Sequence, residues 1–185
     1  MTDSVQNLAA ERITVRGLVQ GVGFRPAVWR LARLHKIRGH VANNGEGVEI
    51  LACGKTEDLE RFIAALKNEP PPLARVDQVN RSPIAGPILP LIGGEIFTIE
   101  ESAATAVRTG VTPDAATCED CRAEIFDPFA RRFRYPFTNC TNCGPRLTII
   151  QSIPYDRRHT TMAAFALCAD CEREYRDPAD RRFHA

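Results

Sequence analysis

The chain has 185 residues, a formal net charge of +1 and 25% charged residues, values typical of a globular protein of one large or two small domains. This near-neutral balance argues against a nucleic-acid-binding or membrane-surface protein. We interpret its clustered arginines as solvated faces that pair with nearby acidic residues; they are Arg131, Arg132, Arg134, Arg157, Arg158, Arg181 and Arg182.

The first eleven residues are polar and lack the apolar stretch of a secretory signal. No run of residues is apolar over the length that a bilayer requires. Seven cysteines without a secretory signal indicate a reducing compartment, where thiols serve metal binding or redox chemistry rather than disulfides. We therefore expect a cytoplasmic protein with no membrane partner.

Hydrophobic periodicity and turn residues predict five strands and two helices, after a disordered N-terminus of residues 1–10. In chain order they are a strand at 11–17, a helix at 24–36, strands at 40–43 and 48–53, a helix with Thr56 as its N-cap, a strand at 76–79, a loop at 82–94 and a strand at 95–100. The first four strands and the two helices follow the order βαββαβ, which predicts an α+β fold of the ferredoxin-like, split βαβ type over residues 11–100. A fold of this type alone fixes no function.

A glycine-rich stretch, Gly17–Arg25, separates the first strand from the first helix. Gly21 and Gly23 permit positive φ and close backbone approach, so the stretch predicts a tight turn at a helix N-terminus. Backbone N–H groups in such a turn form a concave anion site, and the Arg25 guanidinium could hold a phosphate through two hydrogen bonds. Glycines are also common in turns of purely structural purpose, so they do not decide the function by themselves.

The complete string, Gly17-Leu18-Val19-Gln20-Gly21-Val22-Gly23-Phe24-Arg25, resembles the signature loop of the acylphosphatase family. The resemblance implies catalysis by Arg25 and by an asparagine at the end of the second strand, which here is Asn43 rather than Asn44. It also implies a phosphate site formed by Gln20, Gly21, Val22, Gly23, Phe24 and Arg25. Asn43 alone would suit a turn equally well, because Asn43-Asn44-Gly45 is a turn sequence.

The chemistry implied by this resemblance is hydrolysis of an acyl phosphate. The loop and Arg25 would stabilise charge on the phosphoryl oxygens, and the neutral Asn43 amide would position a water for in-line attack on phosphorus. Because an acyl phosphate has a good leaving group, neither a metal nor a covalent intermediate is required. We interpret His35 and His40 as histidines on a helix surface and a strand face rather than as bases.

The second half is organised by cysteines, after a small and polar linker at 101–113. Two C-x₂-C pairs separated by 18 residues predict a closed, structural zinc site, with ligands Cys118, Cys121, Cys140 and Cys143. A redox pair or free buried thiols are the alternatives. Cys53, alone on a strand, is most simply a small core residue.

An internal repeat relates residues 118–133 to residues 168–183 at a shift of 50, with nine of 16 positions identical. The repeat predicts a first zinc unit at 114–150 and a second at 151–185. The second unit contributes Cys168 and Cys171 as metal ligands, and its closing pair would fall after Ala185, so we expect this unit to be truncated. His184 is a candidate third ligand, but its counterpart in the repeat is Arg134.

The tandem cysteine pattern, together with the loop, resembles the N-terminal part of the HypF family of [NiFe]-hydrogenase maturation carbamoyltransferases. The resemblance implies carbamoyl phosphate as the substrate and HypE as the carbamoyl acceptor, reached through further domains. A non-catalytic module, in which the zinc units dock partners and the loop only binds an anion, is the alternative function. Nucleic-acid binding is disfavoured by the near-neutral charge.

Overall fold

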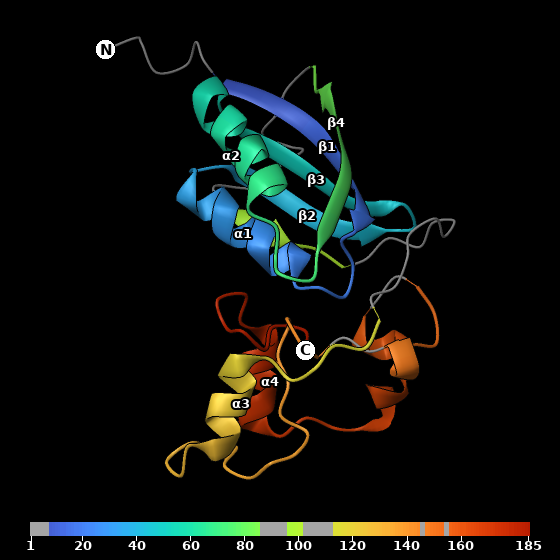
Figure 1. Cartoon of the computed structure of the whole chain (residues 1–185). Helices are drawn as coiled ribbons and strands as arrows, with labels where there is room; N and C mark the ends of the chain where they lie inside the picture. Colours follow the sequence, from blue (N-terminus) through green and yellow to red (C-terminus); the bar gives the residue numbers. More distant parts are fainter. Residues whose placement is uncertain (1–7, 86–95, 102–112, 145–146, 154–155) are drawn as a thin grey trace.

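The computed structural model of the chain describes residues 8–85, 96–101, 113–144, 147–153 and 156–185 (Figure 1). Two halves are visible, and we call them the sheet half (described residues up to 101) and the cysteine-rich half (described residues from 113). Figure 1 shows the cysteine-rich half beneath the end of the sheet half at which helix α1 begins. Arg25 of the sheet half and Asp156 of the cysteine-rich half form an ion pair where these halves meet.

The sheet half is one mixed five-stranded sheet in the order β4-β1-β3-β2-β5. Its strands are β1 Leu8–Leu18, β2 Arg38–Asn44, β3 Gly47–Lys55, β4 Arg75–Pro83 and β5 Phe97–Ile99. The pairings among β1 to β4 are antiparallel, while β5 runs parallel to β2. This is the α+β arrangement that the sequence predicts, with a mixed sheet.

Helices α1 (Phe24–Leu34) and α2 (Thr56–Asn68) lie together on one face of the sheet (Figure 1). Their apolar residues recur at helical spacing, so each helix buries one stripe against the inward-facing residues of the strands. Phe62 of α2 is fully buried and packs against Phe97 of β5, with ring centroids 6.4 Å apart. The core therefore ties the last short strand to the rest of the sheet.

Several expected boundaries differ from the structure. Strand β1 begins at Leu8, so residues 8–10 are part of the sheet rather than of a disordered N-terminus; residues 1–7 lie outside the described residues. Helix α2 includes Thr56 as its first residue, and its N-cap is Lys55, with no side-chain capping bond. The reason is that β3 continues to Lys55 and passes directly into the helix. Residues 102–112 of the expected linker are not described.

The cysteine-rich half contains two short helices that begin at equivalent positions of the sequence repeat. Helix α3 spans Glu119–Phe126 and helix α4 spans Ala169–Arg176, and each follows a cysteine at its N-cap. Three 3₁₀ turns lie between them, at Leu147–Ile149, Arg157–His159 and Thr161–Ala164. Among the described residues, no helix has the length and apolar character needed to cross a membrane.

The buried position of Phe62 gives a test of the core. Replacing Phe62 with Ala should lower the free energy of unfolding by about 3–5 kcal/mol, because a large cavity would remain between α2 and the sheet. Leu34→Ala is the control, since Leu34 is 71% exposed and should change stability by less than about 0.5 kcal/mol. Chemical denaturation measures both, and equal effects would contradict this core assignment.

Candidate active site and candidate metal centre

The glycine-rich stretch forms a tight turn between β1 and α1. Gly21 and Gly23 have φ of 67° and 72°, in the left-handed region, and Gly23 is the N-cap of α1. The first backbone N–H groups of a helix have no partner within the helix, and the helix dipole makes this end positive. Residues 20–25 therefore present backbone donors at the positive end of α1, as an anion site requires.

Side chains of this turn hold it in place rather than point to a ligand. Val22 and Phe24 are buried in the core of the sheet half. The Gln20 amide donates to the backbone oxygens of Asn44 (2.6 Å) and Gly47 (2.8 Å). What these three residues could offer an anion is thus their backbone N–H groups, and Gln20 fixes the turn against the β2–β3 hairpin.

Asn43 and Asn44 have different environments at the end of β2. The Asn44 side chain accepts hydrogen bonds from the backbone N–H groups of Glu46 and Gly47, and so closes the hairpin turn. Asn43 is only 1% exposed, and its Oδ1 accepts no hydrogen bond from any described residue. An unsatisfied buried acceptor costs about 1–3 kcal/mol, so this oxygen is a natural partner for a bound water or ligand.

Arg25 lies in the first turn of α1 and is largely buried. Its Nη2 donates to Asp156 Oδ1 at 2.9 Å, and the two side chains are only 10% and 15% exposed. This ion pair joins the sheet half to the cysteine-rich half across 131 positions of sequence. Sequence reasoning missed Asp156, and no motif could have found it, because nothing in its surroundings distinguishes it from other acidic residues.

Other residues of the cysteine-rich half also lie close to the turn. A Cβ placed on Gly23 would be 3.2 Å from the Thr141 Cβ, so Thr141 lies directly over the N-cap of α1. Burial lowers the pKa of His184 to about 4, and the positive charge of Arg25 contributes. Burial also raises the pKa of Tyr175, and the Asp156 charge raises it further. At neutral pH, His184 and Tyr175 are therefore uncharged.

Histidines of the sheet half have other partners or positions. His40 on β2 lies with its Nδ1 3.3 Å from Glu100 Oε1, and His35 is the C-cap of α1, at the far end from the turn. His35 is thus a helix-end histidine, consistent with its interpretation as a surface residue. We call residues 20–25 the anion turn. With Asn43 it makes up the candidate site, which offers backbone N–H groups, the Asn43 amide and the Arg25 guanidinium.

The first four repeat cysteines converge in the cysteine-rich half. Cys118, Cys121, Cys140 and Cys143 place their sulfur atoms within 4.8 Å of one another, with neighbouring Sγ···Sγ distances of 3.6, 3.7 and 4.0 Å. A tetrahedral zinc with Zn–S of about 2.3 Å would separate its sulfurs by about 3.8 Å. The geometry and the thiolate donor set both fit such an ion. Burial raises the pKa of Cys121, so a cation would be needed to keep its thiolate.

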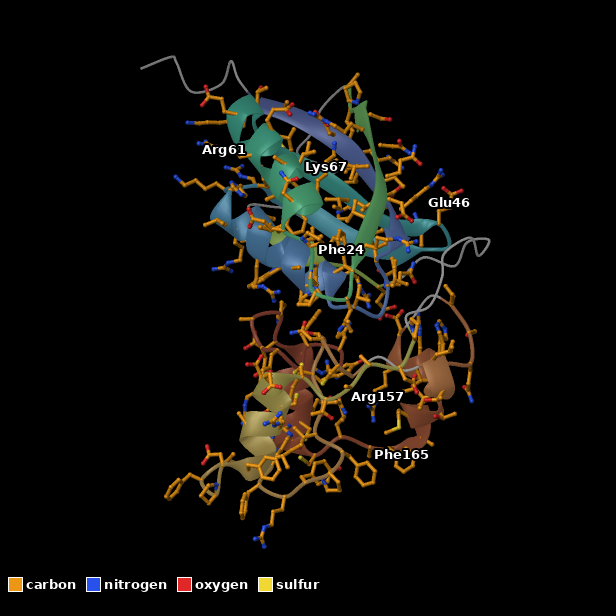
Figure 2. All side chains as sticks on the ribbon, in the orientation of Figure 1. Phe24, Glu46, Arg61, Lys67, Arg157 and Phe165 are labelled. Atoms are coloured by element: carbon orange, nitrogen blue, oxygen red, sulfur yellow. The ribbon has the colours of Figure 1, made fainter. Side chains whose placement is uncertain are left out.

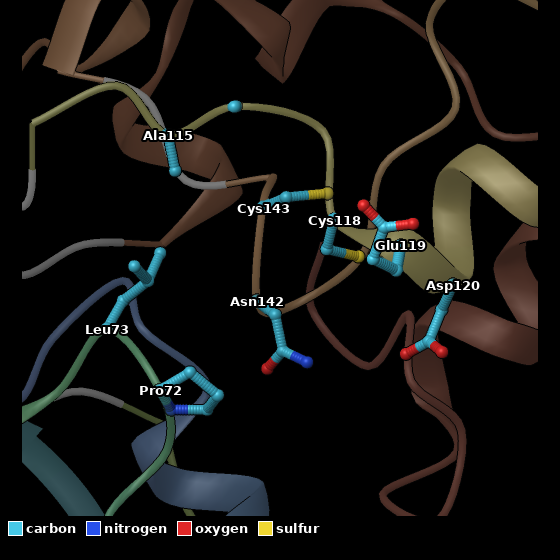
Figure 3. A pocket seen from close by; sticks show the side chains of 9 residues that line it. Pro72, Leu73, Ala115, Cys118, Glu119, Asp120, Asn142 and Cys143 are labelled. Carbon is cyan, nitrogen blue, oxygen red and sulfur yellow. The ribbon is translucent and has the colours of Figure 1, made fainter.

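Figure 3 shows this centre beside a hollow of about 270 Å³ between the two halves. Cys118 and Cys143 lie on its cysteine-rich side, and Pro72 and Leu73 of the sheet half form the opposite wall. A metal at the four sulfurs would therefore stiffen the part of the cysteine-rich half that borders the sheet half.

Cys168 and Cys171 do not join a comparable cluster. Among the described residues, the group of ligating side chains close enough to hold an ion consists of the first four cysteines, and it does not include Cys168 or Cys171. Cys168 is exposed, and His184 stacks between Tyr175 and Phe183 rather than beside these thiols. The alternative in which His184 completes the second site is not what the structure shows.

The two repeat units instead clamp one another through reciprocal contacts. Arg131 donates to Cys171 Sγ (3.5 Å) and pairs with Glu174 (2.7 Å). In the opposite direction, Arg181 donates to Cys121 Sγ (3.0 Å) and pairs with Glu124.

Arg132 and Arg182, at the next repeat position, extend the same pattern to Glu174 and Glu124 respectively. Burial alone would raise the pKa of Glu174, but the hydrogen bonds from Arg132 and Arg131 lower it to about 2. The sequence suggested that these arginines face solvent. In the structure, Arg131, Arg132, Arg181 and Arg182 instead form contacts between the two repeat units.

The sheet half and the cysteine-rich half resemble different protein families. A family model described as Acylphosphatase matches residues 11–88. An acylphosphatase of Latilactobacillus sakei is 43% identical over 76 residues, which cover 40% of this chain and 83% of that protein. The chain belongs to the acylphosphatase family. Its acylphosphatase domain is followed by matches to a second model, described as HypF finger, over residues 117–150 and 167–185.

Together, the acylphosphatase domain and the fingers match the N-terminal region of HypF carbamoyltransferases. The carbamoyltransferase HypF of Rhodobacter capsulatus is 57% identical over 178 residues, covering 96% of this chain and 23% of the relative. A crystal structure of full-length HypF in a phosphate- and nucleotide-bound form superposes with a TM-score of 0.91 at 44% identity, over 99% of this chain and 24% of that one. The chain thus spans about a quarter of the length of these HypF relatives.

The unequal cysteine sites give a prediction about metal content. The protein should retain about one tightly bound divalent ion per chain after dialysis, because four sulfurs converge in the first unit and two lie together in the second. Cys118→Ser should lose this ion. Cys168→Ser, at the equivalent N-cap of α4, should keep it. Elemental analysis by mass spectrometry measures the content, and two ions per chain or equal loss in both variants would contradict the assignment.

Proposed function

We propose that this chain hydrolyses acyl phosphates, with carbamoyl phosphate as the physiological substrate. The observation that carries the proposal is the arrangement at the β2 end: Gln20 holds the anion turn beside Asn43, whose buried oxygen lacks a partner among the described residues. In this proposal, the turn would supply the donors for a phosphoryl group and Asn43 the acceptor for a water. Both are what an acyl-phosphate hydrolase requires.

Substrate binding rests on the turn and on Arg25. Backbone N–H groups of residues 20–25 and the guanidinium would surround the phosphoryl oxygens. These donors are fixed by the buried side chains of Val22 and Phe24 and by the Gln20 bonds. Because they are already oriented, they stabilise the charge that accumulates on the phosphoryl oxygens without reorganising during the reaction.

The Asn43 amide would orient the attacking water through its Oδ1. The water oxygen forms a bond to phosphorus as the bond from phosphorus to the acyl oxygen breaks, and the carbamate leaves as an anion. The proton lost by the water goes to a phosphoryl oxygen, so the products are phosphate and carbamate. Asn43 itself never changes protonation, in keeping with an amide side chain.

The fingers contribute structure rather than chemistry in this proposal. We propose zinc as the ion at Cys118, Cys121, Cys140 and Cys143, because four thiolates in a tetrahedron favour it and leave no open position for substrate. Cys168 and Cys171 would serve a second ion if further ligands are supplied. A reducing compartment, the cytoplasm, would keep all six thiols available for metal.

The similarity to HypF extends the proposal beyond this chain. Relatives of four times its length are named carbamoyltransferases, and a full-length relative binds phosphate and nucleotide. We propose that the carbamate released here is the material for carbamoyl transfer in [NiFe]-hydrogenase maturation, with HypE as the acceptor. A non-catalytic module that binds an anion and docks partners is the second candidate, favoured by the pairing of Arg25 with Asp156.

Two variants test the hydrolysis directly. Arg25→Ala and Asn43→Ala should each lower kcat/KM for carbamoyl phosphate by at least about a hundredfold, because one removes the charged phosphate donor and the other the water-orienting acceptor. Phosphate release in a coupled assay measures the rates.

Matched controls are Arg38→Ala on β2 and Asn80→Ala on β4, which are exposed residues and should leave the rates unchanged. Saturable phosphate binding by the unaltered protein without turnover would favour the non-catalytic module. Full activity in both site variants would disprove the roles given to Arg25 and Asn43.

A further inference from the structure

In this chain, the anion turn is covered by the cysteine-rich half. Thr141 lies over Gly23, and Asp156 reaches Arg25 at 2.9 Å. Tyr175 and His184 are close enough for their pKa values to respond to Arg25 and Asp156. The acylphosphatase family model matches residues 11–88, so these covering residues belong to a part of the chain outside that match. A site with such a cover presents the substrate with side chains from two halves.

The direction of the reaction determines which part of the substrate meets this cover. In-line displacement places the attacking and leaving oxygens on opposite sides of phosphorus. The water lies at Asn43, which is buried within the sheet half at the end of β2. The acyl group therefore leaves on the side away from β2, where Asp156 and the rest of the cysteine-rich half are found (Figure 2 marks Phe24 and Arg157 on either side of this junction).

We propose that Asp156 is a specificity-determining residue of the acyl-phosphate site, which selects a carbamoyl group over alkyl acyl groups. This inference rests on the proposed hydrolysis and adds a residue to its site. The carbamoyl group carries an NH₂ with two donors, and the Asp156 carboxylate is an acceptor with about four lone-pair positions. One of its oxygens holds Arg25, and the carboxylate has further capacity for an N–H of the substrate.

An alkyl acyl group, such as the acetyl of acetyl phosphate, offers no donor at that position. Its methyl would displace water from a carboxylate that is 15% exposed without replacing the lost hydrogen bonds. Sites built to bond a substrate N–H or O–H reject analogues that lack it much more strongly than apolar pockets reject a change of size. The expected discrimination at this single contact is about 10- to 100-fold.

The negative charge of Asp156 is compatible with a phosphate nearby because the Arg25 guanidinium would lie between the carboxylate and the phosphoryl group and bind both. A guanidinium has five N–H donors on two edges, so it can bind the carboxylate and the phosphoryl group together. His184 and Tyr175 are neutral at working pH, with the pKa of His184 at about 4. Arg157 is a second positive charge in this neighbourhood, since it opposes the effect of Asp156 on Tyr175.

The test compares carbamoyl phosphate with acetyl phosphate in the 185-residue protein. We expect the unaltered protein to prefer carbamoyl phosphate, and Asp156→Ala to lower the ratio of the two kcat/KM values by at least about tenfold. Most of this change should come from a lower kcat/KM for carbamoyl phosphate. Asp156→Asn keeps one acceptor oxygen and should retain part of the preference. Asp170→Ala is the control and should leave the ratio unchanged, because Asp170 lies on α4 with a half-exposed side chain that pairs with Arg173.

Two results would overturn the inference. If kcat/KM stays the same or falls by the same factor for both substrates in Asp156→Ala and Asp156→Asn, the carboxylate does not contact the acyl group. If kcat/KM rises by the same factor for both substrates, Asp156 only competes with phosphate for Arg25.

Absence of turnover for either substrate in the unaltered protein would instead disprove the hydrolysis itself. Calorimetry with inorganic phosphate then shows whether the anion turn still binds an anion, because it measures binding without requiring turnover. Retained metal content shows that each variant is folded.

Discussion

The Arg25–Asp156 ion pair is the contact on which the arrangement of the two halves around the site depends. It is largely buried, and a buried ion pair is costly to break because the partner left behind keeps an unpaired charge. The same guanidinium is the donor that an acyl phosphate would need. In the proposed reaction, Arg25 would therefore bind the substrate as well as the cysteine-rich half, which would link the chemistry of the sheet half to the position of the cysteine-rich half.

The fingers can hold Asp156 at Arg25 only if the cysteine-rich half is itself rigid. Its short helices bury little apolar surface, so its shape depends on the four convergent thiols and on the reciprocal contacts between the repeats. Arg131 and Arg132 bind Glu174, while Arg181 and Arg182 bind Glu124. A metal bound by these thiols, as proposed above, would therefore stabilise this half together with the charge pairs, in place of a large hydrophobic core.

Local sequence patterns predicted most of the sheet half. Alternation and helical periodicity gave the order of elements, because each strand and helix buries one face of its own residues. The missed features depend on contacts between distant positions. The start of β1 at Leu8 follows from pairing with β3, and Asp156 reaches Arg25 only because the chain folds back across 131 positions. The arginine pairs looked like solvent-facing charges because the sequence does not show that one repeat lies against the other.

Hydrolysis of carbamoyl phosphate in ¹⁸O-labelled water tests the central claim most directly. If the turn and Arg25 bind the phosphoryl group while Asn43 positions a water against phosphorus, the released phosphate gains one ¹⁸O atom from the solvent. Mass spectrometry of the phosphate measures this after subtraction of the uncatalysed reaction. Enzymatic release of phosphate without solvent oxygen would mean that the bond between phosphorus and the bridging oxygen stays intact. That result would contradict the role proposed for this site.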